Sequence, residues 1–406
     1  MDLVIVGGGP AGLKAAEIAV LNGLQVMLFD AKPSVGRKLL VAGKGGLNLT
    51  HSEPLDRFAK RYLGGHCGAV WTSLLSEFSN NDLRSWAKEL GVETFIGTSG
   101  RVFPLGFKAA PLLRRWVERL RLLGVSFEMN KKLSEITRKD GRLILEFSSD
   151  GKSFPVTSDA VILALGGASW PETGSTGEWP ILFEQLGIAV SPLVAANCGW
   201  EVCWNTDIIG EIEGQPLKNI TVSAGKKKIA GELLITRYGL EGGALYQLGN
   251  TLRTLIKPAL TIDLKPSFSE QELVDKIQFS YNNLTDSAIS SWRLSKAAGF
   301  LLRYFAVVKS LTDPLSLAKE AKALTIPLIG PRPIAEAISS AGGVAFSELN
   351  EYLMIKRIPG LFVAGEMIDW EAPTGGYLLQ GCFATGTRAA NGVCQLLNNE
   401  IPFSQI

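Results

Sequence analysis

The sequence predicts an α/β fold in which a discontinuous domain with a parallel sheet surrounds an inserted domain that is first β-rich and then helical. Three observations support this. Residues 3–30 follow the order strand, glycine turn, helix, strand and acid, and residues 359–397 follow the order buried strand, glycine, acid and helix. Between them, at about residues 191–336, short strands and then helices replace the βαβ pattern.

The first turn carries a glycine pattern typical of dinucleotide binding. Gly7-Gly8-Gly9-Pro10-Ala11-Gly12 precedes a helical stretch of small residues, 13–22. In this pattern Gly7 allows the tight turn, Gly9 lets backbone approach a pyrophosphate, and Gly12 lets the helix pack on the strand. The unpaired N–H groups at the helix start would face the phosphates. We therefore predict a Rossmann-type domain.

An acid follows the second strand, residues 25–29. Asp30 stands eighteen positions after Gly12 and is placed to accept hydrogen bonds from the adenosine ribose. An acid here also disfavours a 2′-phosphate. Because the unit begins at residue 2, its position is more typical of FAD than of NAD, and FAD is the predicted cofactor.

Composition favours a cytoplasmic globular protein with two or three subdomains. The chain has 406 residues, of which 46% are hydrophobic and 20% charged. With 41 basic and 39 acidic residues the net charge is +2, so we expect neither a nucleic-acid nor a membrane partner. No basic residue precedes the N-terminal apolar run, which favours a strand over a signal peptide. The apolar run 297–311 is broken by Arg303 and is predicted to be a buried helix.

The cysteines and histidines predict no metal site. The five cysteines are scattered, and no two have Cys-x-x-Cys spacing: Cys67, Cys198, Cys203, Cys382 and Cys394. Only two histidines are present, His51 and His66. Reduced thiols are therefore expected, without zinc or haem.

A second glycine-rich stretch, Val35–Thr50, follows Asp30. Four glycines and three cations in this loop suit a further contact with phosphate, ribityl or ring, although a solvated surface loop would show the same composition. Amphipathic helices are then expected at 80–92 and 108–124. Residues 125–156 predict a β-meander that leads into the buried strand 159–165 and Gly166-Gly167.

The insert is expected at 191–336, with a β-rich part at 191–265 and a helical part at 266–336. Residues 220–236 predict a hairpin whose turn is Lys226-Lys227-Lys228. Ser269-x-x-Glu272 matches a capping box that opens the helical part. The flanking residues 1–190 and 337–406 would form the FAD-binding domain.

The C-terminal motif predicts the other end of the cofactor site. A buried strand ends at Gly365-Glu366, and Asp369 and Thr374-Gly375-Gly376-Tyr377 precede a helix at about 378–397. The acids could hold the ribityl hydroxyls, and the helix N-terminus would face the flavin N1/O2 edge. The alternative is a structural αβ turn with two ordinary acids.

Together these stretches resemble the bacterial flavoprotein family called BaiN-like, YhiN-like or NAD(FAD)-utilizing dehydrogenases. The resemblance covers the whole chain and rests on the motifs above and on four further stretches: Val102-Phe103-Pro104, Ala164–Gly177, Thr236–Gly242 and Ala341-Gly342-Gly343-Val344. It implies non-covalent FAD and a barrel-plus-helical insert. Where the family has Gly-Gly-Gly-Arg-Cys-Asn and Thr-His-x-Gly-Leu-Ser-Gly-Pro, this chain has Gly43–Asn48 with leucine at 47, and Thr236–Gly243 with arginine at 237. Leu378 replaces the usual asparagine, so the chain resembles a distinct subfamily.

The motifs and the resemblance together imply the cofactor-binding residues. They are Gly7, Gly9, Pro10, Ala11, Gly12, Asp30, Ala31, Lys32, Arg37, Lys38, Lys44, Gly45, Leu47, Asn48, Leu133, Gly166, Gly365, Glu366, Asp369, Gly376, Tyr377 and Leu378. Catalytic candidates are few: Lys44, Arg237 and Tyr377, with Tyr238 and His51 nearby in the motifs. For each of these, anchoring, packing or a solvated side chain is the favoured role, and no residue is assigned to catalysis.

The leading interpretation is an FAD-dependent oxidoreductase that reduces an unsaturated small organic substrate with electrons from NAD(P)H. The chain has no second Gly-x-Gly-x-x-Gly unit, so NAD(P)H would dock transiently, and its assignment follows from the family resemblance alone. Two alternatives stay open: a flavin-dependent RNA-modifying enzyme, and a non-enzymatic flavin-binding sensor or partner protein. The oligomeric state is left open.

Overall fold

The computed structural model describes residues 1–65, 68–149, 151–204, 209–279 and 283–398. The chain divides into two compact units. Unit 1 comprises Met1–Val194 and Ser339–Ile406, and unit 2 comprises Ala195–Ile338. Each unit has its own hydrophobic core.

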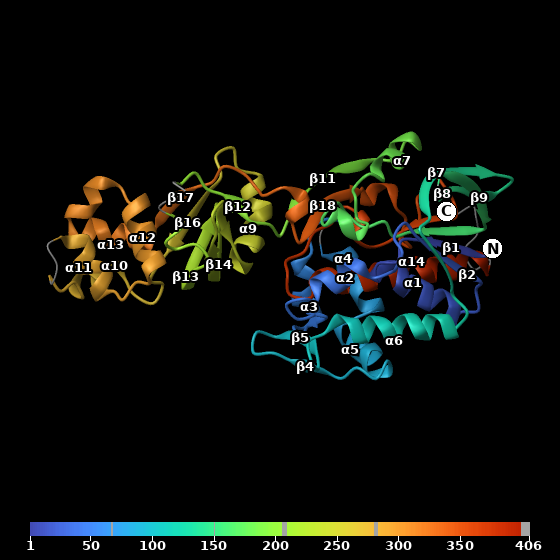
Figure 1. The fold of residues 1–406 in the computed structure, drawn as a ribbon, viewed down its shortest axis with the longest axis horizontal. Helices are drawn as coiled ribbons and strands as arrows, with labels where there is room; N and C mark the ends of the chain where they lie inside the picture. The colour runs from blue at the N-terminus through green and yellow to red at the C-terminus, as the bar shows by residue number, and fades with distance from the viewer. Residues whose placement is uncertain (66–67, 150, 205–208, 280–282, 399–406) are drawn as a thin grey trace. The chain divides into compact units, whose positions relative to one another are not determined.

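Unit 1 is built on a parallel five-stranded sheet of order β19-β10-β1-β2-β6 (Figure 1). Its strands are β1 (Leu3–Val6), β2 (Val26–Asp30), β6 (Ser126–Met129), β10 (Ala160–Leu163) and β19 (Leu361–Val363). Every residue of β1 is buried, as expected for a strand covered on both faces. From β1 the chain adds β2 and β6 on one side, whereas β10 and β19 lie on the other. This reversal is a topological switch point, where open α/β sheets bind ligands beyond the strand ends.

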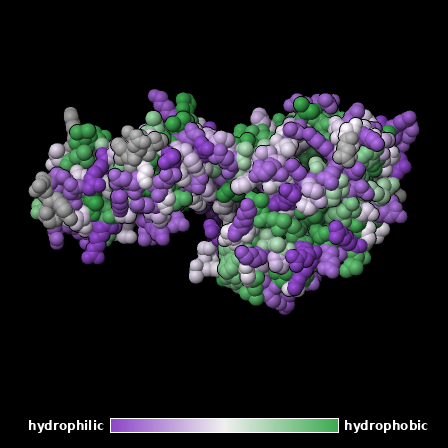
Figure 2. Space-filling model, viewed as in Figure 1, coloured by the Kyte–Doolittle hydropathy of each residue, from purple (hydrophilic) through white to green (hydrophobic). Residues whose placement is uncertain are grey.

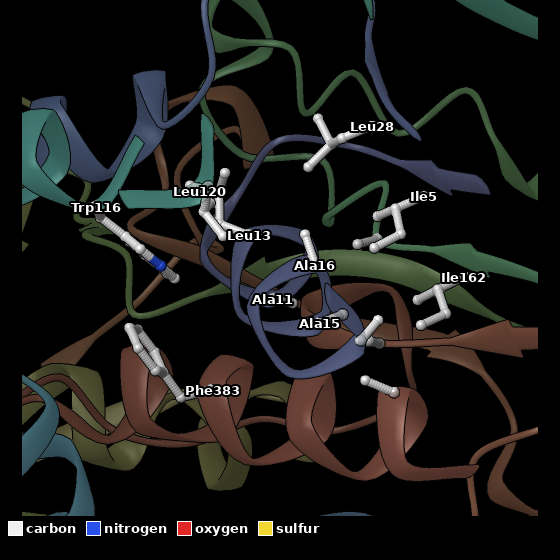
Figure 3. Packing of buried hydrophobic residues seen from close by; sticks show 14 of the residues in the cluster. Ile5, Ala11, Leu13, Ala15, Ala16, Leu28, Trp116, Leu120, Ile162 and Phe383 are labelled. Carbon is white, nitrogen blue, oxygen red and sulfur yellow. The ribbon is translucent and has the colours of Figure 1, made fainter. Parts of the chain in front are cut away.

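The described part of unit 1 also contains α-helices and short 3-10 helices, the latter labelled η. They are α1 (Pro10–Leu21), α2 (Arg37–Ala42), α3 (Leu55–Phe58), η1 (Ala59–Arg61), α4 (Ala69–Glu77), α5 (Asn80–Glu89), α6 (Ala109–Leu122), η2 (Pro171–Thr173), α7 (Pro180–Gln185), η5 (Phe346–Glu348), η6 (Gly365–Met367) and α14 (Tyr377–Leu397). Figure 3 shows Leu13 of α1, Trp116 of α6 and Phe383 of α14 meeting within one cluster. The Trp116 and Phe383 rings stack with centroids 5.1 Å apart.

Three smaller sheets complete unit 1. One comprises β3 (Thr50–His51), β5 (Arg101–Pro104) and β4 (Thr94–Ile96), and another is the meander β7 (Lys132–Lys139), β8 (Arg142–Ser149) and β9 (Lys152–Ser158). The third pairs β11 (Val190–Ala196) with β18 (Ser339–Val344). These two strands carry the chain out of unit 1 and back into it.

Unit 2 combines an antiparallel sheet with a group of helices (Figure 1). The sheet has the order β12-β15-β14-β13-β16-β17, formed by Trp200–Glu201, Gly239–Glu241, Lys227–Ile235, Pro216–Ala224, Ala259–Asp263 and Leu324–Pro327. The edge strand β12 also bonds the segment after β17, through Glu201 N–H to the Gly330 carbonyl at 2.8 Å and Ile329 N–H to the Glu201 carbonyl at 2.8 Å. These bonds join the two edges into a barrel-like ring. The helices are α9 (Gly243–Arg253), α10 (Glu270–Asp275), α11 (Leu284–Ser291), α12 (Lys296–Phe305), η3 (Val308–Thr312), α13 (Pro314–Lys322) and η4 (Ile334–Glu336).

Most predicted elements are confirmed, with corrections. The buried helix expected at 297–311 is α12, which ends at Phe305, and Val307 and Val308 beyond it are 60% and 78% exposed. The expected helical part 266–336 also contains the strand β17, which pairs with β16. The capping box at Ser269 is present, with its hydroxyl accepting from the Glu272 N–H. The first helix begins at Pro10 rather than residue 13, because proline suits the first helical position. Only Lys226 lies in the hairpin turn, with Gly225, whose φ of +53° suits glycine; Lys227 and Lys228 already belong to β14.

The surface of each unit mixes polar and apolar residues on the visible face (Figure 2). None of the helices in the described part of the chain is long and apolar enough to cross a membrane. The cysteines in that part, Cys198, Cys203, Cys382 and Cys394, are unbridged.

Truncating the core of unit 1 tests the packing of α14. We expect Phe383→Ala to lower the free energy of unfolding by about 3–5 kcal/mol, the usual cost of removing a buried aromatic ring. Leu122→Ala is the control, since Leu122 is 83% exposed on α6. Urea denaturation followed by circular dichroism measures both, and equal stabilities for the two variants would contradict this packing.

Candidate functional site

The candidate site lies where β1 and β10 end at the switch point. Gly7 has a φ of +109°, and its N–H donates to the Phe29 carbonyl at 2.8 Å. A Cβ on Gly7 would lie 2.2 Å from the Ala164 oxygen at the end of β10. Only glycine therefore lets the chain turn from β1 so close to its neighbouring strand.

The three motif glycines meet different surroundings. A Cβ on Gly12 would lie 2.0 Å from the Gly7 carbonyl oxygen, so Gly12, like Gly7, is required by the protein's own packing. Gly9 has an ordinary extended backbone, with φ −78° and ψ −179°, and a Cβ there would meet nothing within 4 Å. The open space at Gly9 is what a bound phosphate would occupy.

The start of α1 is suited to an anion. Gly9 is the N-cap, Pro10 takes a first-turn position, and no side chain among the described residues caps the helix. The N–H groups of a helix start and its dipole together attract negative charge. Ala11 is buried beneath this end, 5% exposed.

Asp30 ends β2 with its carboxylate held by backbone. Oδ2 accepts from the Gly8 N–H at 2.8 Å, and Oδ1 accepts from the Lys32 N–H at 2.8 Å. Burial raises the pKa of Asp30, against the two N–H groups that lower it. An ionised carboxylate can accept about four hydrogen bonds, so about two acceptor positions remain for ribose hydroxyls.

The neighbouring residues form the adenosine end of the predicted site. The Asn130 N–H donates to the Lys32 carbonyl at 3.2 Å, and Leu133 follows in β7, where it is 8% exposed. A Cβ on Gly174 would lie 3.2 Å from Lys32 Cγ, so the loop after β10 also reaches this end. Ala31 is exposed beside them.

Helix α2 brings two cations to the site. Arg37 has a buried Nε without a hydrogen-bond partner in the described part of the chain. Lys38 Nζ donates to Ser169 Oγ at 2.6 Å and to Glu366 Oε2 at 2.8 Å. Lys38 therefore links the loop after β10 to the acid after β19.

The loop that follows α2 has an exposed and a buried part. Lys44 and Gly45 are exposed, and a Cβ on Gly45 would meet nothing within 4 Å. Leu47 is 2% exposed, and its N–H donates to the Phe107 carbonyl at 2.7 Å. The buried Oδ1 of Asn48 has no partner among the residues that the structure describes.

The C-terminal motif lies beside these groups. Gly365 has a φ of +80°, and its N–H donates to Thr385 Oγ1 at 2.9 Å. Glu366 Oε1 accepts from the Ser340 N–H at 2.8 Å, and Asp369 Oδ2 accepts from Ser191 Oγ at 2.7 Å. Gly166 has a φ of +73°, and its carbonyl accepts from Trp179 Nε1 at 2.9 Å.

Helix α14 starts against β3. Gly376, at φ +96°, is its N-cap, and a Cβ there would lie 2.4 Å from Thr50 Cα. The Tyr377 hydroxyl donates to Glu53 Oε1 at 2.6 Å, and Arg61 binds both oxygens of Glu53 at 3.0 and 2.9 Å. Burial and the Glu53 carboxylate raise the pKa of Tyr377 well above its usual range.

This environment favours an anchoring role for Tyr377. Its side chain is 5% exposed, and its ring stacks on His51 with centroids 5.4 Å apart. Leu378 is partly buried against the same core. A hydroxyl that already donates to a carboxylate is poorly placed to protonate a substrate.

Two further candidates belong to unit 2. Arg237 has a side chain 69% exposed and lies 3.6 Å from Glu213 Oε2. The Tyr238 hydroxyl donates to Glu241, and the Arg332 guanidinium lies 4.3 Å from the Tyr238 ring centre. No group of three or more potential metal-ligating side chains occurs within the described ranges.

Sequence reasoning missed three serines of the site: Ser191 and Ser340, which donate to Asp369 and Glu366, and Ser169, which accepts from Lys38. They lie far along the chain from their partners: 131 residues separate Lys38 from Ser169, and 178 separate Ser191 from Asp369. A serine also has no pattern that marks it as a partner. Two signals were available: Ser340 directly precedes the recognised Ala341–Val344 stretch, and Ser169 lies within the recognised stretch Ala164–Gly177.

Known proteins are similar to this chain in sequence and in fold. A 3-dehydro-bile acid delta(4,6)-reductase of Clostridium scindens is 24% identical over 96% of this chain and 98% of its own length. A ribosomal RNA dihydrouridine synthase of Escherichia coli is 22% identical over 96% of this chain and 97% of its own. The solved 3-ketosteroid-delta4-(5alpha)-dehydrogenase of Rhodococcus jostii has a TM-score of 0.54 at 17% identity, covering 97% of this chain and 96% of its own, which supports the shared fold.

The sequence also matches one family profile over nearly its whole length, residues 1–392, described as the HI0933-like protein Rossmann domain. The glycine turn, the acid at β2 and the switch point are the features that such a domain requires. The chain therefore belongs to the HI0933-like Rossmann family.

Proposed function

We propose that this protein is an FAD-dependent oxidoreductase that reduces a carbon–carbon double bond conjugated to a carbonyl, with NAD(P)H as electron donor. The observation that carries the FAD part is the contrast between the motif glycines. At Gly7 and Gly12, backbone atoms of the protein occupy the space where a Cβ would lie. At Gly9 this space is open, and it lies at a helix start that no side chain caps. That arrangement suits a ligand phosphate.

The residues around this point fit the parts of FAD. Asp30 would accept from the adenosine ribose, and the N–H groups at the start of α1 would receive the pyrophosphate. Arg37 offers a buried Nε without a partner in the described ranges, which suits an anionic group. Glu366 and Asp369 would face the ribityl chain, and the start of α14 the flavin.

FAD would supply two-electron transfer between donor and acceptor, while the protein binds, orients and tunes it. The positive end of α14, a helix that spans Tyr377–Leu397, favours negative charge near its N-terminus. Lys38 lies at the same site, where its charge is paired with Glu366. The helix end would therefore supply the electrostatic stabilisation of the reduced cofactor.

The substrate class follows from the names of two relatives. A 3-dehydro delta(4,6) steroid acid carries double bonds in conjugation with a ketone, and uridine carries a double bond in conjugation with a carbonyl. Both names denote reduction of such a bond. We therefore propose this bond type for the chain, in a small organic molecule.

Ribosomal RNA is the second candidate substrate. It is favoured by two relatives named ribosomal RNA dihydrouridine synthase, from Escherichia coli and Haemophilus influenzae, at 22% and 24% identity. The balance of 41 basic and 39 acidic residues gives no general attraction to nucleic acid. We favour the small molecule on this ground. We also propose a cytoplasmic location, which the composition favours.

Replacing Gly9 tests the cofactor site. We expect Gly9→Val to fold, at a cost of about 1 kcal/mol for a poorer N-cap, but to lose FAD, because the side chain would occupy the phosphate position. The flavin-to-protein ratio from absorption spectra measures this. Gly330→Val is the matched control, since a Cβ there also meets nothing within 4 Å. Normal flavin content in Gly9→Val would reject the assignment.

Replacing Asp30 tests the ribose contact. We expect Asp30→Ala to stay folded and to bind FAD about 10- to 100-fold more weakly, since bonds to a charged group contribute about 1.5–3 kcal/mol. Flavin fluorescence titration of the apoprotein gives the dissociation constant. The exposed Asp140→Ala, in the turn after β7, is the control. An unchanged constant would place the ribose elsewhere.

An anaerobic titration tests donor and substrate together. We expect NADH or NADPH to bleach the visible flavin absorption, and a polycyclic conjugated enone to restore it, whereas the matching saturated ketone does not. Unmodified ribosomal RNA forms a parallel arm, with dihydrouridine measured by mass spectrometry. If dithionite reduces the flavin but neither NADH nor NADPH does, NAD(P)H is rejected as the electron donor. If RNA reoxidises the reduced flavin and the enone does not, ribosomal RNA is favoured as the substrate.

A further inference from the structure

The two acids of the C-terminal motif bind the two strands through which the chain leaves and re-enters unit 1. Strands β11 and β18 pair with each other as a separate two-stranded sheet. Glu366 is bonded to β18 and Asp369 to β11. The same short segment thus serves the predicted cofactor site and both strands of the junction.

Ser340 holds one oxygen of Glu366 from β18. Its N–H donates to Oε1 at 2.8 Å, and its hydroxyl lies 3.4 Å from the same oxygen while accepting from the Ala168 N–H at 3.0 Å. Ser340 is 1% exposed. A Cβ on Gly167 would lie 1.7 Å from Ser340 Oγ, so glycine at 167 leaves the room that this hydroxyl needs.

Lys38 holds the other oxygen of Glu366. The pair is 2.8 Å apart, with side chains 27% and 12% exposed, so solvent weakens it only in part. Lys38 also donates to Ser169 Oγ at 2.6 Å. The orientation of the Glu366 carboxylate is therefore fixed jointly by β18, α2 and the loop after β10.

Asp369 repeats this arrangement with β11. Its Oδ2 accepts from Ser191 Oγ at 2.7 Å, and its N–H donates to the Val344 carbonyl of β18 at 2.9 Å. Close backbone contact accompanies these bonds. A Cβ on Gly342 would lie 2.1 Å from the Pro192 oxygen, and one on Gly343 would lie 2.4 Å from the Met367 oxygen.

We propose that Ser340 and Ser191 are positioning residues for the cofactor, which orient Glu366 and Asp369 and couple FAD binding to the order of β11 and β18. The inference rests on the proposed FAD site. A ligand that favours one orientation of these carboxylates also favours the serine contacts that hold it, and the effect is reciprocal. FAD should therefore stabilise the junction strands, and loss of either serine should weaken FAD binding.

Hydrogen exchange of the apoprotein with and without FAD tests the coupling, in peptides that cover 188–196 and 339–346. In the wild type we expect FAD to slow exchange in both. Ser191→Ala removes the 2.7 Å bond to Asp369, so it should lose most of this FAD-dependent slowing at 188–196 and bind FAD about tenfold more weakly, the effect of one bond to a charged group. Ser191→Thr, which keeps the hydroxyl, should restore both. Ser340→Ala keeps the N–H bond to Glu366 and removes only the hydroxyl, so it should lose part of the slowing at 339–346 and weaken FAD binding by less than Ser191→Ala does.

The control is Ser158→Ala. Ser158, the last residue of β9, is also fully buried, and its hydroxyl donates to the Ala160 carbonyl at 2.7 Å. This variant should have a lower melting temperature, but its FAD affinity and FAD-dependent slowing should be unchanged. Wild-type slowing retained in Ser340→Ala and Ser191→Ala would overturn the coupling alone. A wild type that binds no FAD would instead overturn the proposed function.

Discussion

The structure of unit 1 depends on backbone touching backbone around the first helix. Gly7 passes the Ala164 oxygen, Gly12 passes the Gly7 oxygen, and Gly386 of α14 passes the Ala11 oxygen, where a Cβ would lie 2.2, 2.0 and 2.4 Å away, respectively. These contacts set the depth of α1 between the sheet and α14. They also fix the direction of its N-terminal N–H groups before any ligand arrives. Donors that are already oriented need little reorganisation when a ligand binds. This advantage offsets the large conformational entropy that each glycine loses on folding.

The middle of α1 is fixed by a buried charge cluster. Glu17 is fully buried and accepts from Trp86 Nε1 at 2.8 Å, while Lys14 and Arg119 lie 3.2 and 3.3 Å from its oxygens. Burial lowers the pKa of Lys14, although Glu17 opposes the shift. Such clusters contribute little net stability compared with apolar packing, but an incomplete one is costly. The cluster therefore specifies how α1 packs against α5 and α6. Together with the glycine contacts, it determines the position of α1 on the sheet.

Local sequence patterns made the order of most helices and strands, and the glycine turn of unit 1, predictable from sequence. The glycine turn, Asp30, the capping box and the amphipathic helices each depend on residues within a few turns of one another. The hairpin turn was misplaced because three lysines look alike in sequence, whereas the strand register and the glycine at 225 select Lys226. A barrel was expected only from the family resemblance. Its closure between β12 and the segment after β17 was not predicted, since that segment was assigned to the helical part and more than a hundred residues separate the partners.

The acids of the C-terminal motif show where sequence reasoning stops. Glu366 and Asp369 were predicted from their place after a strand, but the pattern does not reveal that each already serves a serine of the protein. A carboxylate suits this double duty, because it accepts at both oxygens and keeps acceptor capacity for a ligand. An amide at 366 would turn a donor toward either Lys38 or the Ser340 N–H, and one of those contacts would become repulsive. The protein's own contacts thus favour a carboxylate over an amide at 366, before any cofactor binds.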